Sequence, residues 1–170
     1  MALTMHSASV PVFARMLGHM DLWLEKAAAH AEARKFDPKA FLTARLAPDM
    51  LPFPNQIQIA SDNAKGCVAR LAGVEIPKYE DTETTLEELR ERLRKTIDFV
   101  RSVPEAKFEG AEGRAIELPR RTGEPLRFTG EQYLVHFALP NFYFHATTAY
   151  ALLRHNGVPL GKRDFLGLTY

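Results

Sequence analysis

Three polar side chains that could do chemistry interrupt the apolar segment HFALPNFYFHATTAYALLRHNG, residues 136–157. Asn141 and His145 are four residues apart, so on a helix they share one face and lie one turn from each other. His136 precedes His145 by nine residues and lies on the opposite side of an ideal helix, unless Pro140 distorts the turns before it. An imidazole near an amide can bind a ligand or act as a general base, and it can equally be a satisfied polar pair in a packed core.

The rest of the sequence offers few other reactive groups. It contains no glycine-rich phosphate loop and no nucleophile elbow. Its single cysteine, Cys67, excludes an internal disulfide and is typical of a reducing compartment, and we expect a buried, inert thiol on a helix. The histidines other than His136 and His145 are expected at the surface: His6, His19, His30 and His155.

The composition indicates one domain with no strong electrostatic preference for a partner. With 170 residues the chain can bury one core, and we treat residues 1–170 as a single domain. Lysine plus arginine (22) nearly balance aspartate plus glutamate (21), so the charge predicts no binding to nucleic acid. The apolar run 133–153 has the length of a membrane span, but its histidines, asparagine and proline argue against insertion. The N-terminus lacks a secretory signal pattern, so we expect a cytoplasmic protein.

Helical periodicity predicts four long helices. Their expected ranges are residues 9–34, 54–73, 84–103 and 129–157. The third and fourth begin with capping-box patterns, Thr84 with Glu87 and Thr129 with Gln132, in which each side chain bonds a free backbone N–H. Gly73 and Gly157 are placed to end the second and the fourth.

The connections between these helices are long. A proline-rich crossover, residues 36–53, has room for a turn or two of helix near residues 40–46. Residues 114–128 form two short stretches around Thr122 and Gly123, which predicts a small β-hairpin. The tail carries Phe165, Leu166 and Tyr170 and is expected to pack against the bundle. We therefore predict an all-α fold, a four-helix bundle with long crossover connections plus a β-hairpin before the fourth helix.

The fourth helix has apolar residues on all its faces, including Tyr143, Phe144 and Tyr150, and no charge between Glu131 and Arg154. A helix of this kind needs cover on every side. We expect the hairpin and the tail to cover one part and a second copy of the chain to cover another, and we therefore predict a homodimer.

The sequence resembles a known family. The similarity is carried by LPNFYFHATTAYALLRHNGVPLGKRDFLG, by NQIQIASDNAKGCVARLAG and by the hairpin between them. These segments resemble an uncharacterised bacterial domain-of-unknown-function family of the DinB-like (YfiT-like) superfamily, and the resemblance covers nearly the whole chain. It implies a four-helix bundle with long crossovers, usually dimeric. Members of the wider superfamily often hold nickel or zinc with three histidines, one on helix 2 and an H-x-x-x-H pair on helix 4, and some transfer low-molecular-weight thiols or hydrolyse small substrates.

This chain keeps only part of that metal-binding pattern. The pair on the fourth helix reads Asn141-x-x-x-His145, and the second helix has no histidine; its nearest polar candidates are Gln58 and Asp62, one turn apart. Zinc and nickel favour imidazole and thiolate, so one histidine with amide and carboxylate oxygens makes a weak site. Three interpretations follow: an open metal site with Asp62 and His145, a metal-free ligand pocket, or a structural cluster of Gln58, Asp62, Asn141 and His145.

Our leading functional hypothesis is a variant site centred on His145. In a catalytic version His145 is a metal ligand or general base and Asp62 orients it. The expected ligand-binding residues are Gln58, Asn141, His136 and Tyr143. The expected ligand is a small molecule, and the cofactor is either none or a divalent metal, nickel or zinc. The competing hypothesis is a non-catalytic dimeric scaffold or binding module whose polar cluster is structural, and the sequence assigns no reaction.

Overall fold

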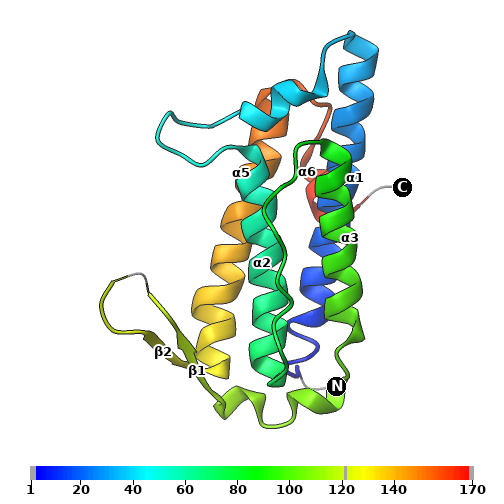
Figure 1. Ribbon diagram of the computed structural model, residues 1–170. Coiled ribbons are helices and arrows are strands. Elements are labelled where there is room, and N and C mark those ends of the chain that lie inside the picture. Colours follow the sequence, from blue (N-terminus) through cyan, green and yellow to red (C-terminus); the bar gives the residue numbers. More distant parts are fainter. Residues whose placement is uncertain (1–2, 121, 169–170) are drawn as a thin grey trace.

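The structure is a computed structural model that describes residues 3–120 and 122–168. Four long helical elements lie side by side in a bundle (Figure 1). They are α1 (Val10–Arg34), α2 (Phe53–Ala72), α3 (Leu86–Ser102) and a fourth helix made of α4 (Gly130–Gln132), η4 (Tyr133–Ala138) and α5 (Leu139–His155). The predicted four-helix bundle with long connections is confirmed.

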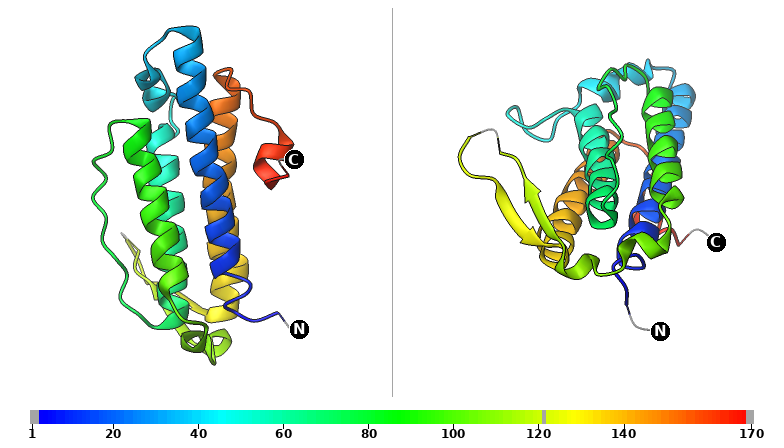
Figure 2. Two further views of the ribbon diagram at one scale, coloured as in Figure 1. Left: turned by 90° about the vertical axis from the view of Figure 1, so that its right-hand side faces the viewer. Right: turned by 60° about the horizontal axis from the view of Figure 1, so that its bottom comes forward.

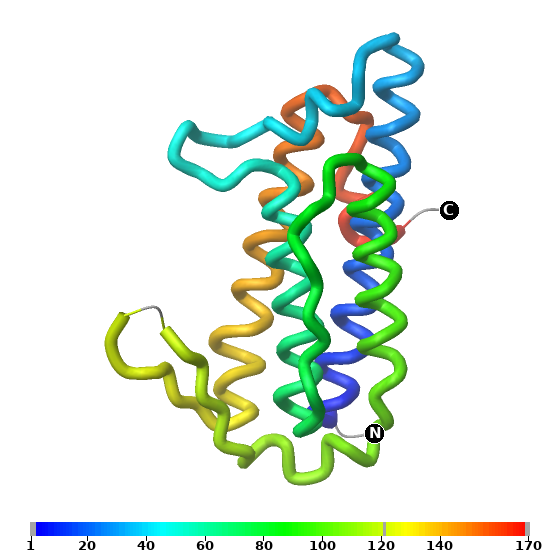
Figure 3. The backbone as a smooth tube through the Cα atoms, in the orientation of Figure 1, coloured from blue at the N-terminus to red at the C-terminus, as the bar shows by residue number. Residues whose placement is uncertain are grey.

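Short elements occupy the connections. The crossover from α1 to α2 contains a 3-10 helix, η1 (Pro38–Thr43), close to the predicted turn. The segment after α3 contains two more, η2 (Glu105–Phe108) and η3 (Ala111–Gly113), followed by the hairpin β1 (Ala115–Leu118) and β2 (Leu126–Thr129). Figure 3 traces these connections, including the extended segment 74–85 that runs along the bundle between α2 and α3. A short helix, α6 (Lys162–Leu166), follows α5.

The predicted helix ends are confirmed with one correction. Gly73 ends α2 with a positive φ of 66°, a conformation that costs glycine little. Thr129 and Gln132 form the expected capping box. The capping box of α3 is formed by Thr85 and Glu88, one residue after the predicted pair. Residues 84–88 read TTLEE, so each threonine has a glutamate three residues later, and the sequence pattern alone does not decide between the two registers.

Pro140 is accommodated without a break in the fourth helix. The preceding segment, η4, is π-helical, and the N–H of Leu139 donates to the carbonyl of Leu134, five residues earlier. A wider turn of this kind lets a helix pass a residue that has no N–H to donate. The expected distortion therefore widens the turns around His136, which stays exposed.

The hairpin and the tail cover parts of the bundle. The strands pair antiparallel, with Ala115 opposite Thr129. Phe128 of β2 packs against Tyr133 and Phe137, with ring centroids 6.1 and 5.7 Å apart, so the hairpin covers the first turns of the fourth helix. The ring of Phe165 in α6 stacks on Trp23 at 5.5 Å.

The tail lies along α1 (Figure 2, left). The indole N–H of Trp23 donates to the carbonyl of Asp164 over 3.1 Å, and Lys26 forms an ion pair with the Asp164 carboxylate. This confirms the predicted packing for Phe165, whereas Leu166 stays 42% exposed and Tyr170 lies outside the described residues. Within residues 3–120 and 122–168, no helix has both the length and the apolar character needed to span a membrane.

Candidate functional site

His145 belongs to a chain of hydrogen bonds that joins α5 to the start of α2. Its Nδ1 lies 2.8 Å from Oε1 of Gln56, and Nε2 of Gln56 donates to the carbonyl of Leu51 over 2.9 Å. Gln56 is 2% exposed and His145 is half-buried. The pair therefore bridges two helices where little water reaches the amide.

The protonation of His145 follows from its partners. The carbonyl of Leu51 can only accept a hydrogen bond, so the group of Gln56 that faces it is the NH₂. The oxygen of Gln56 then faces His145, and Nδ1 of the imidazole must carry the proton that it donates. In a neutral ring, Nε2 is consequently the unprotonated nitrogen, an acceptor and a base.

Burial lowers the pKa of His145 below its ordinary value. Removing a charged ring from water costs energy, which favours the neutral form. The imidazole is therefore neutral at pH 7, and Nε2 keeps its lone pair.

The other predicted residues of the fourth helix do not all join His145. Asn141 lies one turn before it and is half-buried. Tyr143 lines a different cavity, next to Arg15 and Phe165 between α1 and the tail. Burial raises the pKa of Tyr143, and the nearby charge of Arg15 opposes that shift. His136 is exposed in η4.

Gln58 and Asp62 lie on another side of α2, so the predicted cluster of four residues is not brought together. On a helix they lie about 200° and 240° around the axis from Gln56. Gln58 accepts from the side chain of Asn55 over 2.8 Å and donates to Glu83 over 2.9 Å. Asp62 is thus separated from His145 by the body of α2, and the expected orientation of His145 by Asp62 does not occur.

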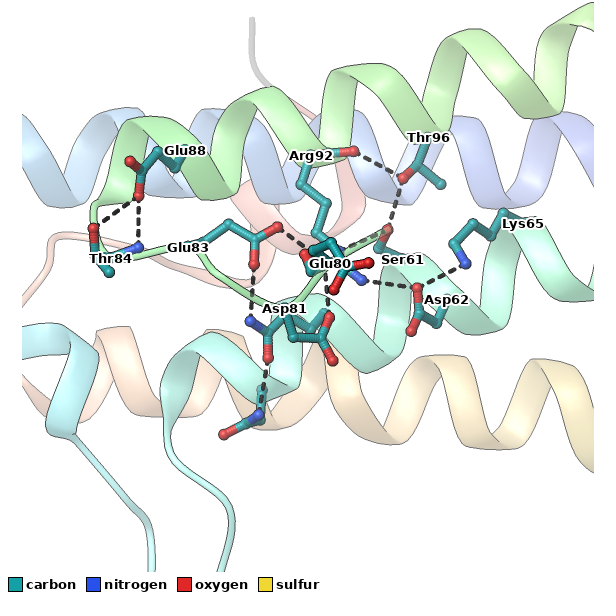
Figure 4. Close-up of polar contacts among 12 residues, drawn as sticks. Ser61, Asp62, Lys65, Glu80, Asp81, Glu83, Thr84, Glu88, Arg92 and Thr96 are labelled. Carbon is teal, nitrogen blue, oxygen red and sulfur yellow. Dashed lines mark hydrogen bonds and ion pairs between the residues drawn. The ribbon is translucent and has the colours of Figure 1, made fainter. Parts of the chain in front are cut away.

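Asp62 instead belongs to a cluster around Arg92, which we call the Arg92 cluster (Figure 4). The side chain of Arg92 is only 2% exposed and pairs with Asp62 and Glu83 at 2.8 Å and with Asp81 at 2.9 Å. It also donates to the carbonyl of Glu80 over 3.0 Å. These contacts tie the segment 74–85 to α2 and α3.

The Arg92 cluster is held together by charge. Burial alone would lower the pKa of Arg92, but the hydrogen bond to Glu83 and the nearby carboxylates outweigh it, and the pKa lies above its ordinary value. A buried guanidinium that stays charged needs such partners. The cluster is a structural tie in which each named carboxylate already has a cationic partner.

Gln56 is the residue that the sequence reasoning missed. It lies four residues before Ala60 and eleven before Cys67, on the stripe of α2 that faces the core. The sequence signal that identifies Gln56 is its place in this core-facing stripe. On the same face lies Asn63, whose Oδ1 is buried and has no hydrogen-bond partner among the described residues.

The residues near His145 do not fit nickel or zinc. The polar neighbours of His145 are the amides of Asn141 and Gln56, which are poor ligands for these metals, and the Gln56 oxygen is already bonded to His145. Across the part of the chain that the structure describes, no three histidine, cysteine, aspartate or glutamate side chains are grouped so that they could hold a metal ion.

Comparisons with known proteins identify the family. A family model described as "Domain of unknown function (DUF1993)" matches residues 5–166. A crystal structure of a DinB family member protein from Shewanella denitrificans is 43% identical, with a TM-score of 0.89, over 95% of this chain and 91% of that one. A search of the curated proteins found no match. The chain therefore belongs to the DUF1993 family, and its bundle is that of a DinB family member.

Proposed function

We propose that this chain is a metal-independent binding protein for a small molecule, with its site at Nε2 of His145. The observation that carries the proposal is the ordered chain from Leu51 through Gln56 to His145, which fixes one tautomer and leaves an unprotonated ring nitrogen. Fixing the tautomer through the other nitrogen is how proteins prepare a histidine to bind or to accept a proton.

The chemistry of the site selects ligands that donate a hydrogen bond. A neutral imidazole Nε2 accepts from a hydroxyl, an amide N–H or a protonated acid, and the amide of Asn141, one turn away, can both donate and accept. These groups favour a polar, uncharged ligand such as an alcohol or an amide.

Nuclear magnetic resonance of the histidine side chains tests the tautomer directly. We expect His145 to carry its proton on Nδ1 and to titrate below the range of an exposed histidine. Benzyl alcohol and benzyl methyl ether form a matched probe pair, since only the alcohol can donate. We expect the alcohol to shift the His145 resonances and the ether to leave them unchanged.

Two variants complete the test. His145→Ala should abolish the response to benzyl alcohol, whereas His155→Ala, which changes an exposed histidine at the end of the same helix, should retain it. A proton on Nε2, or equal responses to the alcohol and the ether, would overturn the proposal. Stoichiometric binding of nickel or zinc that requires His145 would overturn its metal independence.

A second proposal, a homodimer, is supported by the outer face of α5. Phe144 is 57% exposed, and no Asp, Glu, Lys or Arg occurs between Glu131 and Arg154. The hairpin and the segment 44–52 project from the bundle at opposite ends of the fourth helix (Figure 1). An exposed aromatic in an uncharged surface between two projections is typical of a protein interface.

A second copy of the chain fits this face if the two α5 helices lie antiparallel and are related by a twofold axis at Phe144. Phe144 is the midpoint of residues 133–155, so Phe137 of one copy lies opposite Ala151 of the other, a large side chain against a small one. The hairpin of one copy then meets the segment 44–52 of the other. Arg120 of the hairpin and Asp49 of that segment are exposed, have opposite charges and lack an ion-pair partner among the described residues.

Sedimentation equilibrium distinguishes this interface from others. We expect the wild-type chain to dimerise at micromolar concentrations and Phe144→Asp to be a folded monomer, with circular dichroism verifying the fold. Leu22→Asp is the matched control, because Leu22 is 50% exposed on α1 and lines a cavity beside the tail. A monomeric wild-type chain, or dissociation by Leu22→Asp with a dimeric Phe144→Asp, would refute the interface.

A further inference from the structure

A cavity of about 650 Å³ lies at the end of the bundle where the chain starts. Three segments form it: residues 3–8 before α1, the connection through η2 and η3, and the first turns of the fourth helix. Figure 2 (right) shows these segments together at that end of the molecule. The volume lies within the range of sites that bind small molecules, about 300 to 1,000 Å³.

The wall of the cavity is apolar. Phe108 of η2 and Leu134 of η4 are buried, and the ring of His6 meets Phe108 edge to face at 5.2 Å. Met5 and Val135 extend this wall toward the solvent. A ligand with an apolar body can therefore remove hydrophobic surface from water here.

Two of the segments that form the cavity are in direct backbone contact. A Cβ at Gly130 would lie 1.8 Å from the carbonyl oxygen of Ala111, so the start of the fourth helix touches the backbone of η3. Only glycine permits that approach. The two segments that carry most of the lining are thereby fixed against each other.

The rim of the cavity carries only negative charge. Four exposed glutamates line it, and none of them has an ion-pair partner among the described residues: Glu105, Glu109, Glu112 and Glu131. None of the described lining residues is a lysine or an arginine. In a chain whose formal charge is +1, this is a strongly acidic local field.

The occupant that this chemistry recognises is larger than a metal ion. No three acidic or histidine side chains in residues 3–120 and 122–168 are grouped closely enough to hold a metal. Carboxylates spread around an apolar cavity instead match a charge carried on an apolar body. We propose that the cavity binds a small organic cation, an alkyl- or arylammonium ion whose apolar part contacts Phe108 and Leu134 and whose ammonium group faces the glutamates.

Isothermal titration with three probes of equal chain length tests this proposal. Hexylammonium, hexan-1-ol and hexanoate each contain six carbons in a straight chain, and they differ in the charge of the head group. We expect hexylammonium to bind with an affinity that falls as salt is added, and hexanoate not to bind. Equal affinities for hexylammonium and hexan-1-ol would overturn the proposal that the cavity selects a positively charged ligand.

Two variants locate the site on the protein. The double variant Glu109→Gln/Glu131→Gln removes two charges without changing shape, and we expect it to weaken hexylammonium binding about fivefold. Glu32→Gln is the control, since Glu32 is an exposed glutamate of α1 with no ion-pair partner among the described residues. Val135→Ser removes part of the apolar wall and should weaken binding as well. Unchanged affinity in both the double variant and Val135→Ser would refute the site.

Discussion

Replacing Arg92 with methionine should lower the free energy of unfolding by about 3 kcal/mol. Methionine keeps the apolar stem of the side chain and removes the guanidinium. The carboxylate of Glu83, 11% exposed, then lies in the protein without a cation. Asp62 and Asp81 are 43% and 56% exposed and remain hydrated, so they contribute little to the loss. For a chain of this size, 3 kcal/mol corresponds to a thermal midpoint about 6 to 12 °C lower.

The loss should depend on pH. In the wild-type chain burial raises the pKa of Glu83, but hydrogen bonds from Arg92 and Gln58 outweigh it, and the pKa lies below its ordinary value. Such a group stabilises the fold above its unfolded pKa, about 4.3, and this contribution is lost as the pH falls through the folded pKa. Without Arg92, burial dominates and the ionised carboxylate destabilises the fold until acid protonates it. The difference in free energy of unfolding between the wild-type chain and Arg92→Met should therefore be largest near pH 7 and should become smaller toward pH 4.

Urea unfolding followed by circular dichroism across this pH range measures both effects. Arg101→Met is the matched control, because Arg101 is an exposed arginine of α3 with no ion-pair partner among the described residues. It should change stability by less than about 0.5 kcal/mol. Adding Glu83→Gln to Arg92→Met should restore part of the loss. A loss no larger than that of Arg101→Met, or one independent of pH, would refute the reasoning.

Three further predictions concern the backbone and the thiol. In urea unfolding, Gly130→Ala should destabilise the fold by about 3 kcal/mol, because the added Cβ would lie 1.8 Å from a backbone oxygen. Gly113→Ala is the control and should be nearly neutral, because a Cβ at Gly113 has no atom within 4 Å. Thr85→Ala should lower the free energy of unfolding by about 1 kcal/mol in the same assay, and Thr84→Ala by less than half of that, because only Thr85 accepts a hydrogen bond from the helix backbone. A larger loss for Thr84→Ala than for Thr85→Ala would instead support the capping box of Thr84 and Glu87 expected from the sequence. Cys67 should resist thiol reagents in the folded chain and react after unfolding, because burial raises its pKa and blocks access; rapid labelling of the native chain would contradict this.

Much of the fold could be predicted because its signals are local. Apolar spacing identified the four long helices, and Gly73 and the Thr129 capping box located two of their ends. The hairpin around Gly123 follows from turn chemistry that acts over a few residues. The π-helical turns before Pro140 could not be predicted, since a proline in a helix can also kink or end it.

The candidate site depended on information that is not local. Both faces of α2 carry polar residues, and the spacing of Gln58 and Asp62 suited a cluster with the fourth helix as well as a cluster with α3. The decision between them rests on where the neighbours lie. Arg92 of α3 and Glu83 of the segment 74–85 take Gln58 and Asp62, and this leaves Gln56 to face His145.

The sequence by itself determined the four long helices, the ends at Gly73 and Thr129, the hairpin, the same-face pair of Asn141 and His145 and the resemblance to the family. Only the tertiary structure decided which face of α2 meets α5, and with it the tautomer of His145. The physical reason is that a helix fixes the angles between its own side chains, whereas its rotation about its axis is set by the partners against which it packs.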